Sequence, residues 1–196
     1  MAKERKEGSQ HERLSSRAAL IIIDVQRGFD EPAWGHRNNE YAEERMAGLL
    51  GAWRSSGRPV YHVKHMSHLP HSPLRAGQPG NAIKEEVQPR GDEPVIEKNV
   101  NSAFIGTDLE SRLRKAGIDT LVLTGIATDH CVSTTARMAG NLGFRCFVVA
   151  DATATFDRTG YDGKHFSAEE VHEIALASLS DEFATVIESS DLLDML

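Results

Sequence analysis

Residues 119–143 read DTLVLTGIATDHCVSTTARMAGNLG and indicate a strand, a tight loop and a helix in succession. The segment Thr120 to Thr124 is a short apolar, β-branched run that Gly125 bounds. From about His130, apolar and small residues recur at helical spacing, at Val132, Ala136, Ala139 and Leu142. A strand that leads through a short loop into a helix is the repeating unit of an α/β domain with a parallel sheet.

The rest of the chain repeats this alternation. The other predicted strands are residues 17–24, 59–64, 95–98, 146–150 and 183–187, and the other predicted helices are residues 40–53, 108–116, 168–179 and 190–196. The run ALIIID at residues 19–24 is continuously apolar until its last residue, which is typical of a parallel strand buried on both faces. Residues 65–93 form a long polar stretch that we expect to supply a pocket wall or a subunit contact. The pattern predicts an α/β fold of three αβα layers around a six-stranded parallel sheet.

Length and composition narrow the class of protein. The 196 residues suffice for one sizeable core, so we predict a single domain over residues 17–196 and a flexible or loosely docked arm over residues 1–16. The net charge of −7 argues against a nucleic-acid partner or an anionic membrane surface. No apolar run approaches the roughly 20 residues that span a bilayer, and the first residues lack the apolar segment of a secretory signal. Two cysteines, Cys131 and Cys146, provide no disulfide framework, which favours a reducing, cytoplasmic setting.

Cys131 stands where a nucleophile is easily made. Unpaired backbone N–H groups and the helix dipole favour an anion at a helix N-terminus, so we predict a lowered pKa for this thiol. The same N–H groups could hold the oxyanion of a tetrahedral acyl intermediate. The alternative is a small buried hydrophobic residue at a helix start, which is how most free cysteines behave.

Three motifs, in this order along the chain, resemble the signature of the isochorismatase-like cysteine hydrolases: ALIIIDVQRGF (residues 19–29), PVIEKNVNSAF (94–104) and TGIATDHCVSTTARMA (124–139). This superfamily includes nicotinamidases, N-carbamoylsarcosine amidases and isochorismatases. The resemblance implies that Cys131 is the nucleophile and that Asp24 and Lys98 complete a catalytic triad. It also implies a Rossmann-like sheet with strand order 3-2-1-4-5-6.

The resemblance implies a mechanism at the carboxyl edge of this sheet, where ligands bind in open α/β folds. Asp24 takes the thiol proton, Lys98 favours both the carboxylate and the thiolate, and the thiolate attacks an amide carbonyl. The backbone N–H groups of Ala127 and Cys131 hold the oxyanion, and the peptide bond between Ile126 and Ala127 is expected to be cis. The strand of Lys98 lies two positions from strand one, about 10 Å away, and the resemblance implies that its loop folds back over the sheet.

A histidine series invites a metal interpretation, since His62, His65, His68 and His71 recur at every third residue. Nicotinamidases bind a metal through an Asp-x-His pair just after strand two and a further histidine, whereas this chain has His65-Met66-Ser67 at that place. In a strand, moreover, His62 and His65 point to opposite faces. We therefore expect no metal and no cofactor, and nicotinamidase activity is disfavoured.

The leading hypothesis is a cytoplasmic amidase that cleaves a C–N amide bond of a small molecule through a thioester acyl-enzyme. Phe29, Phe104 and Phe156 are predicted to line its pocket, although packing or a subunit interface would also account for them. The resemblance implies a homo-oligomer, a dimer or a tetramer. Hydrolysis of a non-amide bond, in an ester or an isochorismate-type vinyl ether, and a redox-sensing thiol without hydrolase activity are the alternatives. Substrate identity lies outside what the motifs indicate.

Overall fold

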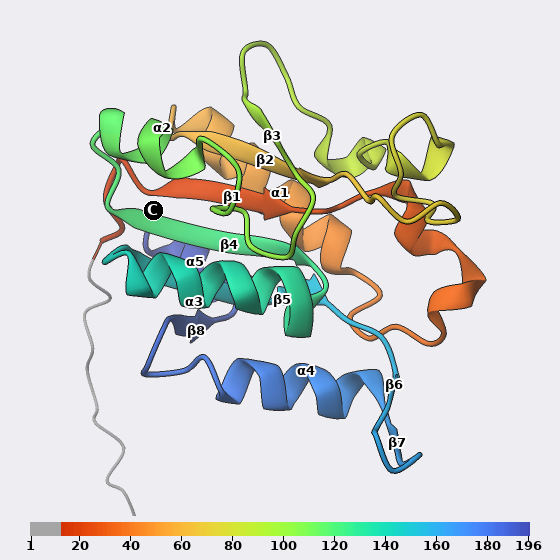
Figure 1. Ribbon diagram of the computed structural model, residues 1–196. Helices are drawn as coiled ribbons and strands as arrows, with labels where there is room; N and C mark the ends of the chain where they lie inside the picture. The colour runs from red at the N-terminus through yellow and green to blue at the C-terminus, as the bar shows by residue number, and fades with distance from the viewer. Residues whose placement is uncertain (1–12) are drawn as a thin grey trace, which may run out of the picture.

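A six-stranded parallel sheet forms the centre of the protein in a computed structural model that describes residues 13–196 (Figure 1). Its strands lie in the order β3-β2-β1-β4-β5-β8, and all neighbouring pairs are parallel. The strands are β1 (Ala19–Ile23), β2 (Val60–His65), β3 (Val95–Lys98), β4 (Thr120–Ile126), β5 (Arg145–Ala154) and β8 (Thr185–Ile187). Counted along the chain, the six sheet strands follow the predicted order 3-2-1-4-5-6, which is confirmed.

Helices cover both faces of the sheet and complete three layers (Figure 1). They are α1 (Ala42–Ser55), α2 (Leu109–Lys115), α3 (Ser133–Asn141), α4 (Ala168–Ala177) and α5 (Ser189–Asp194). Short 3-10 turns are η1 (Arg27–Asp30), η2 (Pro32–Trp34), η3 (Pro79–Asn81) and η4 (Glu85–Val87), and a π-helical turn, η5 (Thr128–Val132), precedes α3. Each helix is short enough to lie across one face of the sheet and buries an apolar stripe there.

Strand β1 shows why two cores form. All five of its residues are buried, and because successive side chains point to opposite faces, Leu20 and Ile22 belong to one core while Ile21 and Ile23 belong to the other. The first core includes apolar residues of α1 and α5, such as Met46, and the second includes apolar residues of α2, α3 and α4. The continuous apolar run in the sequence therefore reflects burial on both faces.

Gly125 was predicted to end the fourth strand, and this is wrong. Strand β4 continues through it to Ile126, with a shift in the register to β5 at this point. Gly125 has φ 133°, and a Cβ there would stand 2.0 Å from the carbonyl oxygen of Ile23. The glycine therefore allows β4 to approach β1 closely rather than breaking the strand.

Two further differences concern a hairpin and the N-terminal arm. The sequence missed a two-stranded antiparallel hairpin, β6 (Arg158–Thr159) and β7 (His165–Phe166), which stands apart from the main sheet (Figure 1). The predicted N-terminal arm comprises residues 1–16, of which residues 1–12 lie outside the described residues. Within its remainder Leu14 is buried, and its N–H donates to the Met195 carbonyl at 2.8 Å, so this part is docked. Between residues 13 and 196 there is no helix with the length and apolarity to cross a membrane.

Candidate active site

Three predicted site residues meet at the carboxyl edge of the sheet. Asp24 directly follows β1 and has φ 54°, Lys98 is the last residue of β3, and Cys131 lies in the π-helical turn between β4 and α3. The Lys98 ammonium donates to Asp24 Oδ2 at 2.5 Å and to Cys131 Sγ at 3.4 Å. The side chains of Asp24 and Lys98 are both 0% exposed, so this ion pair is fully removed from solvent.

The loop after Lys98 does run back over the sheet toward α3, because Asn101 lines the cavity with Cys131 and the Ala103 N–H donates to Thr135 at 3.1 Å, but Lys98 itself comes before this loop. It lies within β3 and pairs with His65 of β2, whereas the end of β1, Ile23, pairs with Val63. Strand β3 therefore extends beyond the level at which β1 ends, and the long lysine side chain crosses β2 to reach Asp24. The side chain, and not the loop, covers the interval of two strands.

The electrostatics of the thiol also differ from the expectation. Burial raises the pKa of Cys131, the charge of Asp24 raises it further, and Lys98 opposes both without overcoming them. The predicted lowering at the helix N-terminus is therefore wrong for the resting site, because the thiol is only 9% exposed and lies beside a carboxylate. Burial likewise raises the pKa of Asp24, against the opposing influence of Lys98.

Asp24 offers one oxygen for chemistry. Its Oδ2 is held by Lys98, whereas its Oδ1 is buried and has no hydrogen-bond partner among residues 13–196. A buried carboxylate oxygen without a partner is costly, and a catalytic role is one explanation for such a group. The peptide bond between Ile126 and Ala127 is cis, and Ala127 lines the same cavity as Asp24 and Cys131.

A cavity of about 300 Å³ opens onto this group. Phe29 and Phe156 line it together with Trp34, and the three rings lie 5.0 to 6.0 Å apart. The other lining residues are Ser67, Leu69, Ser72 and Leu74 of the long loop, and His65, Asn101, His130 and Arg158. The long loop thus supplies a pocket wall, as predicted. Phe104 does not line this cavity, because it is partly buried against the core beneath α2, α3 and α4, where its ring stacks on Phe144 with 5.8 Å between the centroids.

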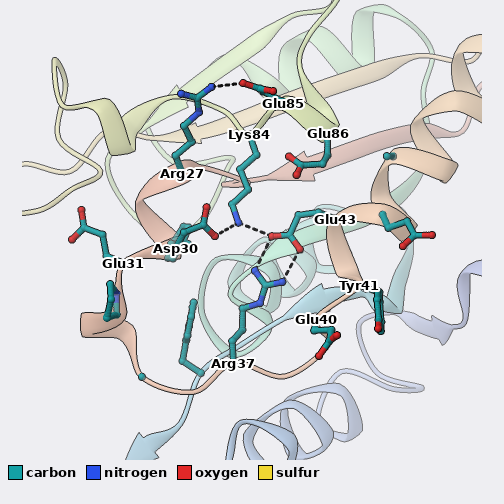
Figure 2. A pocket seen from close by; sticks show the side chains of 16 residues that line it. Arg27, Asp30, Glu31, Arg37, Glu40, Tyr41, Glu43, Lys84, Glu85 and Glu86 are labelled. Carbon is teal, nitrogen blue, oxygen red and sulfur yellow. Dashed lines mark hydrogen bonds and ion pairs between the residues drawn. The ribbon is translucent and has the colours of Figure 1, made fainter.

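A network of charges supports the loops that carry these aromatic rings (Figure 2). Lys84, buried beneath a neighbouring cleft, bonds Asp30 and Glu43, and Arg37 forms two bonds of 2.7 and 2.6 Å to the same Glu43 carboxylate. Asp30 follows Phe29, and Arg37 forms a β-bridge with Phe156. The network therefore fixes two walls of the active-site cavity from outside.

A second charged group lies at the rim of the cavity. Arg158 donates through Nε to Asp129 Oδ2 at 2.9 Å and through an amino group to Oδ1 at 3.2 Å, and Thr155 also donates to Asp129. Although burial alone would raise the pKa of Asp129, the bonds from Arg158 and Thr155 lower it. This pair ties the turn that carries Cys131 to the hairpin. Sequence reasoning missed Arg158 because each hairpin strand has only two residues.

The donor set of the centre suits an ammonium ion better than a metal. Asp24, His65 and Cys131 offer ligand atoms within 4.8 Å of one another, but the Lys98 ammonium already contacts all three. A cation among these ligands would have to displace it. The histidine series does not converge, since His62 bonds Glu93 at 3.0 Å and His68 bonds Asn99 at 2.8 Å.

Comparisons with known proteins agree with the resemblance that the three sequence motifs indicate. Residues 18–191 match the family model of the Isochorismatase domain. The isochorismatase family protein YrdC of Bacillus subtilis is 46% identical over 181 residues, which cover 92% of this chain and 97% of that protein. Nicotinamidase 3 of Arabidopsis thaliana is 32% identical over 188 residues, covering 89% and 86%. A crystal structure of an isochorismatase-family protein from Chromobacterium violaceum superposes with a TM-score of 0.93 at 46% identity, covering 96% and 97%.

Proposed function

This chain belongs to the isochorismatase family of hydrolases, and from that premise we propose that it cleaves a C–N amide bond of a small molecule through a thioester on Cys131. One observation carries the proposal. A buried ammonium, Lys98, joins the Asp24 carboxylate and the Cys131 thiol at the wall of a cavity, and the second oxygen of Asp24 has no partner among the described residues. The base Asp24, the nucleophile Cys131 and the cation Lys98 thus lie together in one buried site.

In the first half of the reaction, Asp24 Oδ1 takes the proton of the Cys131 thiol as sulfur attacks the amide carbonyl. Because burial raises the pKa of the thiol, this transfer accompanies attack on the bound substrate rather than preceding it. The carbonyl oxygen becomes an oxyanion, which the N–H groups of Ala127 and Cys131 hold. The C–N bond then breaks, Asp24 returns the proton to the departing nitrogen, and a thioester is left.

In the second half, water attacks the thioester carbonyl and gives a proton to Asp24. The C–S bond breaks, sulfur leaves, and the proton on Asp24 returns to it, so the acid is released and the enzyme is regenerated. The Lys98 ammonium contacts the carboxylate and the sulfur and stabilises negative charge on each in turn. Amide chemistry is supported by the similarity to a nicotinamidase. A cavity of about 300 Å³ suits only a small substrate.

The resting thiol is poorly suited to the redox alternative. Redox-sensing cysteines are typically accessible and have a low pKa, whereas Cys131 is 9% exposed and its pKa is raised. Hydrolysis of an ester or vinyl ether would use the same cavity and is distinguished by the substrate panel below.

We further propose that residues 17–196 work as one hydrolase domain, in the cytoplasm and as a homo-oligomer, without a metal. The two free thiols, Cys131 and Cys146, suit a reducing compartment. The contacts of Lys98 with three acceptors support metal-free catalysis, since the ammonium holds the position that a metal ion would need.

The test is ammonia release from a panel of small amides, with nicotinamide and carbamoyl compounds included. Wild type is compared with Cys131→Ala and with Cys146→Ala, a matched control in which the other buried cysteine, on β5, is removed. We expect release by wild type and Cys146→Ala and none by Cys131→Ala. If no amide releases ammonia while an ester or vinyl ether is cleaved in a Cys131-dependent manner, the amidase assignment is wrong.

A further inference from the structure

Among residues 13–196, His65 makes the one contact to the Lys98 ammonium that the triad does not explain. Its Nδ1 lies 3.2 Å from Lys98 Nζ, and its ring lines the active-site cavity. Resting on the proposed function, we infer that His65 is a positioning residue, a neutral acceptor that holds the Lys98 ammonium between Asp24 and Cys131.

The count of donors and acceptors supports this role. A lysine ammonium has three N–H donors. In the part of the chain that the structure describes, Lys98 Nζ has three acceptors within reach, Asp24 Oδ2 at 2.5 Å, His65 Nδ1 at 3.2 Å and Cys131 Sγ at 3.4 Å. With the His65 acceptor in place every donor is used and the ammonium has one position. Without it, one N–H is unsatisfied in a buried site, and the ammonium can turn away from the sulfur.

The backbone of His65 is itself clamped. The buried side-chain amide of Gln26 accepts from the His65 N–H at 2.9 Å and donates to the His65 carbonyl at 3.1 Å. The side chain of Asn81 donates to the same carbonyl at 3.0 Å. Two buried amides from different loops therefore fix the residue from which the imidazole projects, which a ring that only filled space would not require.

The charge state of the ring follows from its neighbours. The groups that face it are Lys98, Asp24, His68, the Cys131 thiol, whose sulfur lies within 4.8 Å of a ring nitrogen, and the backbone of Val100. Burial, together with Lys98 and His68, lowers the pKa of His65, against the opposing effects of Asp24 and the Val100 hydrogen bond. As a neutral ring with its proton on Nε2, it presents Nδ1 as an acceptor. Protonation would turn that acceptor into a donor that faces a second cation.

Two substitutions of His65 test the hydrogen-bond acceptor and the aromatic ring separately. His65→Asn keeps an acceptor oxygen near the position of Nδ1 but cannot titrate, and His65→Phe keeps a ring but no acceptor. His65→Leu is a second apolar replacement, so that a folding defect of one variant does not decide the result. His71→Phe is the matched control, because His71 is an exposed histidine of the long loop that follows His65 and does not line the cavity.

The first readout is the rate at which iodoacetamide alkylates Cys131 between pH 5 and 9, with the alkylated residue identified by peptide mass. It needs no substrate, so it tests His65 even if the proposed hydrolysis fails. The second is kcat and KM for whichever amide the panel identifies. We expect His65→Phe and His65→Leu to lower both the alkylation rate at pH 7 and kcat by about ten- to a hundred-fold, the effect of losing a hydrogen bond to a charged group, with little change in KM.

His65→Asn and His71→Phe are expected to stay within about threefold of wild type. The Cys131 thiol loses reactivity with falling pH in every variant, because only the thiolate is alkylated. Below pH 6.5, where His65 gains its proton, the wild-type rate is expected to fall more steeply than this common trend, and His65→Asn is expected to lack this extra acid step. The inference is overturned if the two apolar variants react like wild type. It is equally overturned if His65→Asn is as slow as His65→Phe, or if the acid step persists unchanged in His65→Asn.

Discussion

Replacing Lys98 by methionine removes the only cation that contacts the buried Asp24 carboxylate among the described residues, and it keeps the length of the side chain. Breaking a fully buried pair by removing one partner costs about 3–5 kcal/mol, because the other charge is left uncompensated. Asp24 can escape this penalty only by taking up a proton. At pH 7 that uptake costs about 4 kcal/mol, from the roughly 3 pH units that separate neutrality from the ordinary pKa of Asp near 3.9.

The pH dependence of the stability of Lys98→Met shows whether Asp24 is ionised in wild type. Burial already raises the pKa of Asp24, and loss of Lys98 removes the influences that oppose the rise, so the folded-state pKa in Lys98→Met lies above the unfolded value. A carboxyl group of this kind binds more protons when folded, so the variant loses stability as pH rises toward its folded pKa. If Asp24 is ionised in wild type, as a general base must be, the deficit at pH 7 exceeds that at pH 5 by up to about 2.7 kcal/mol.

Urea unfolding of wild type and Lys98→Met at pH 5 and pH 7 measures this difference. The double variant Asp24→Asn/Lys98→Met is the control, since it removes both charges and should recover most of the stability lost at pH 7. An equal deficit at the two pH values, with no recovery in the double variant, would mean that Asp24 carries no charge in the wild-type site. The general-base role would then be refuted.

Three further predictions follow from particular contacts. Although burial alone would raise it, hydrogen bonds from Arg37 and Lys84 lower the pKa of Glu43 from 4.5 to about 2, so Glu43→Gln should cost about 3 kcal/mol at pH 7 in urea unfolding. That cost should shrink as pH falls from about 4.5 toward about 2, where both proteins carry a neutral side chain, and a constant cost would contradict the linkage. Trp34→Ala should reduce kcat/KM about tenfold, chiefly through KM, because a ring that lines the cavity is lost, whereas Phe104→Ala should change KM little. Gly125→Ala should abolish soluble expression, because its Cβ would stand 2.0 Å from the Ile23 oxygen. The control Gly48→Ala in α1, where a Cβ meets no atom within 4 Å, should raise the free energy of unfolding by about 0.5–1 kcal/mol. A soluble, stable Gly125→Ala protein would contradict the close approach of β4 to β1.

Much of the fold could be predicted because buried strands and helices have characteristic patterns of apolar residues. The run at residues 19–24 is apolar because β1 is buried on both faces, and the segment from Thr120 to Gly143 changes from strand to helix periodicity at the turn that carries Cys131. The two-residue strands of the hairpin are too short for any periodicity, so Arg158 and its bond to Asp129 could not be anticipated.

Features of the site that depend on strand register or tertiary burial escaped sequence reasoning. The reach of Lys98 and its contact with His65 follow from the pairing of β3 with β2, which no local pattern specifies. The raised pKa of Cys131 follows from how deeply the finished fold buries the thiol. Phe104 follows Lys98 by six residues and Phe29 follows Asp24 by five, yet the chain turns the first against the core and the second into the cavity.

The central claim is that an acyl group passes through sulfur of Cys131, and partition to hydroxylamine tests it most directly. With an amide that the panel identifies, wild type in the presence of hydroxylamine is predicted to form the acyl hydroxamate, because hydroxylamine intercepts the thioester, and Cys131→Ala is predicted to form neither hydroxamate nor acid. Release of the free acid by Cys131→Ala at the wild-type rate would contradict the account.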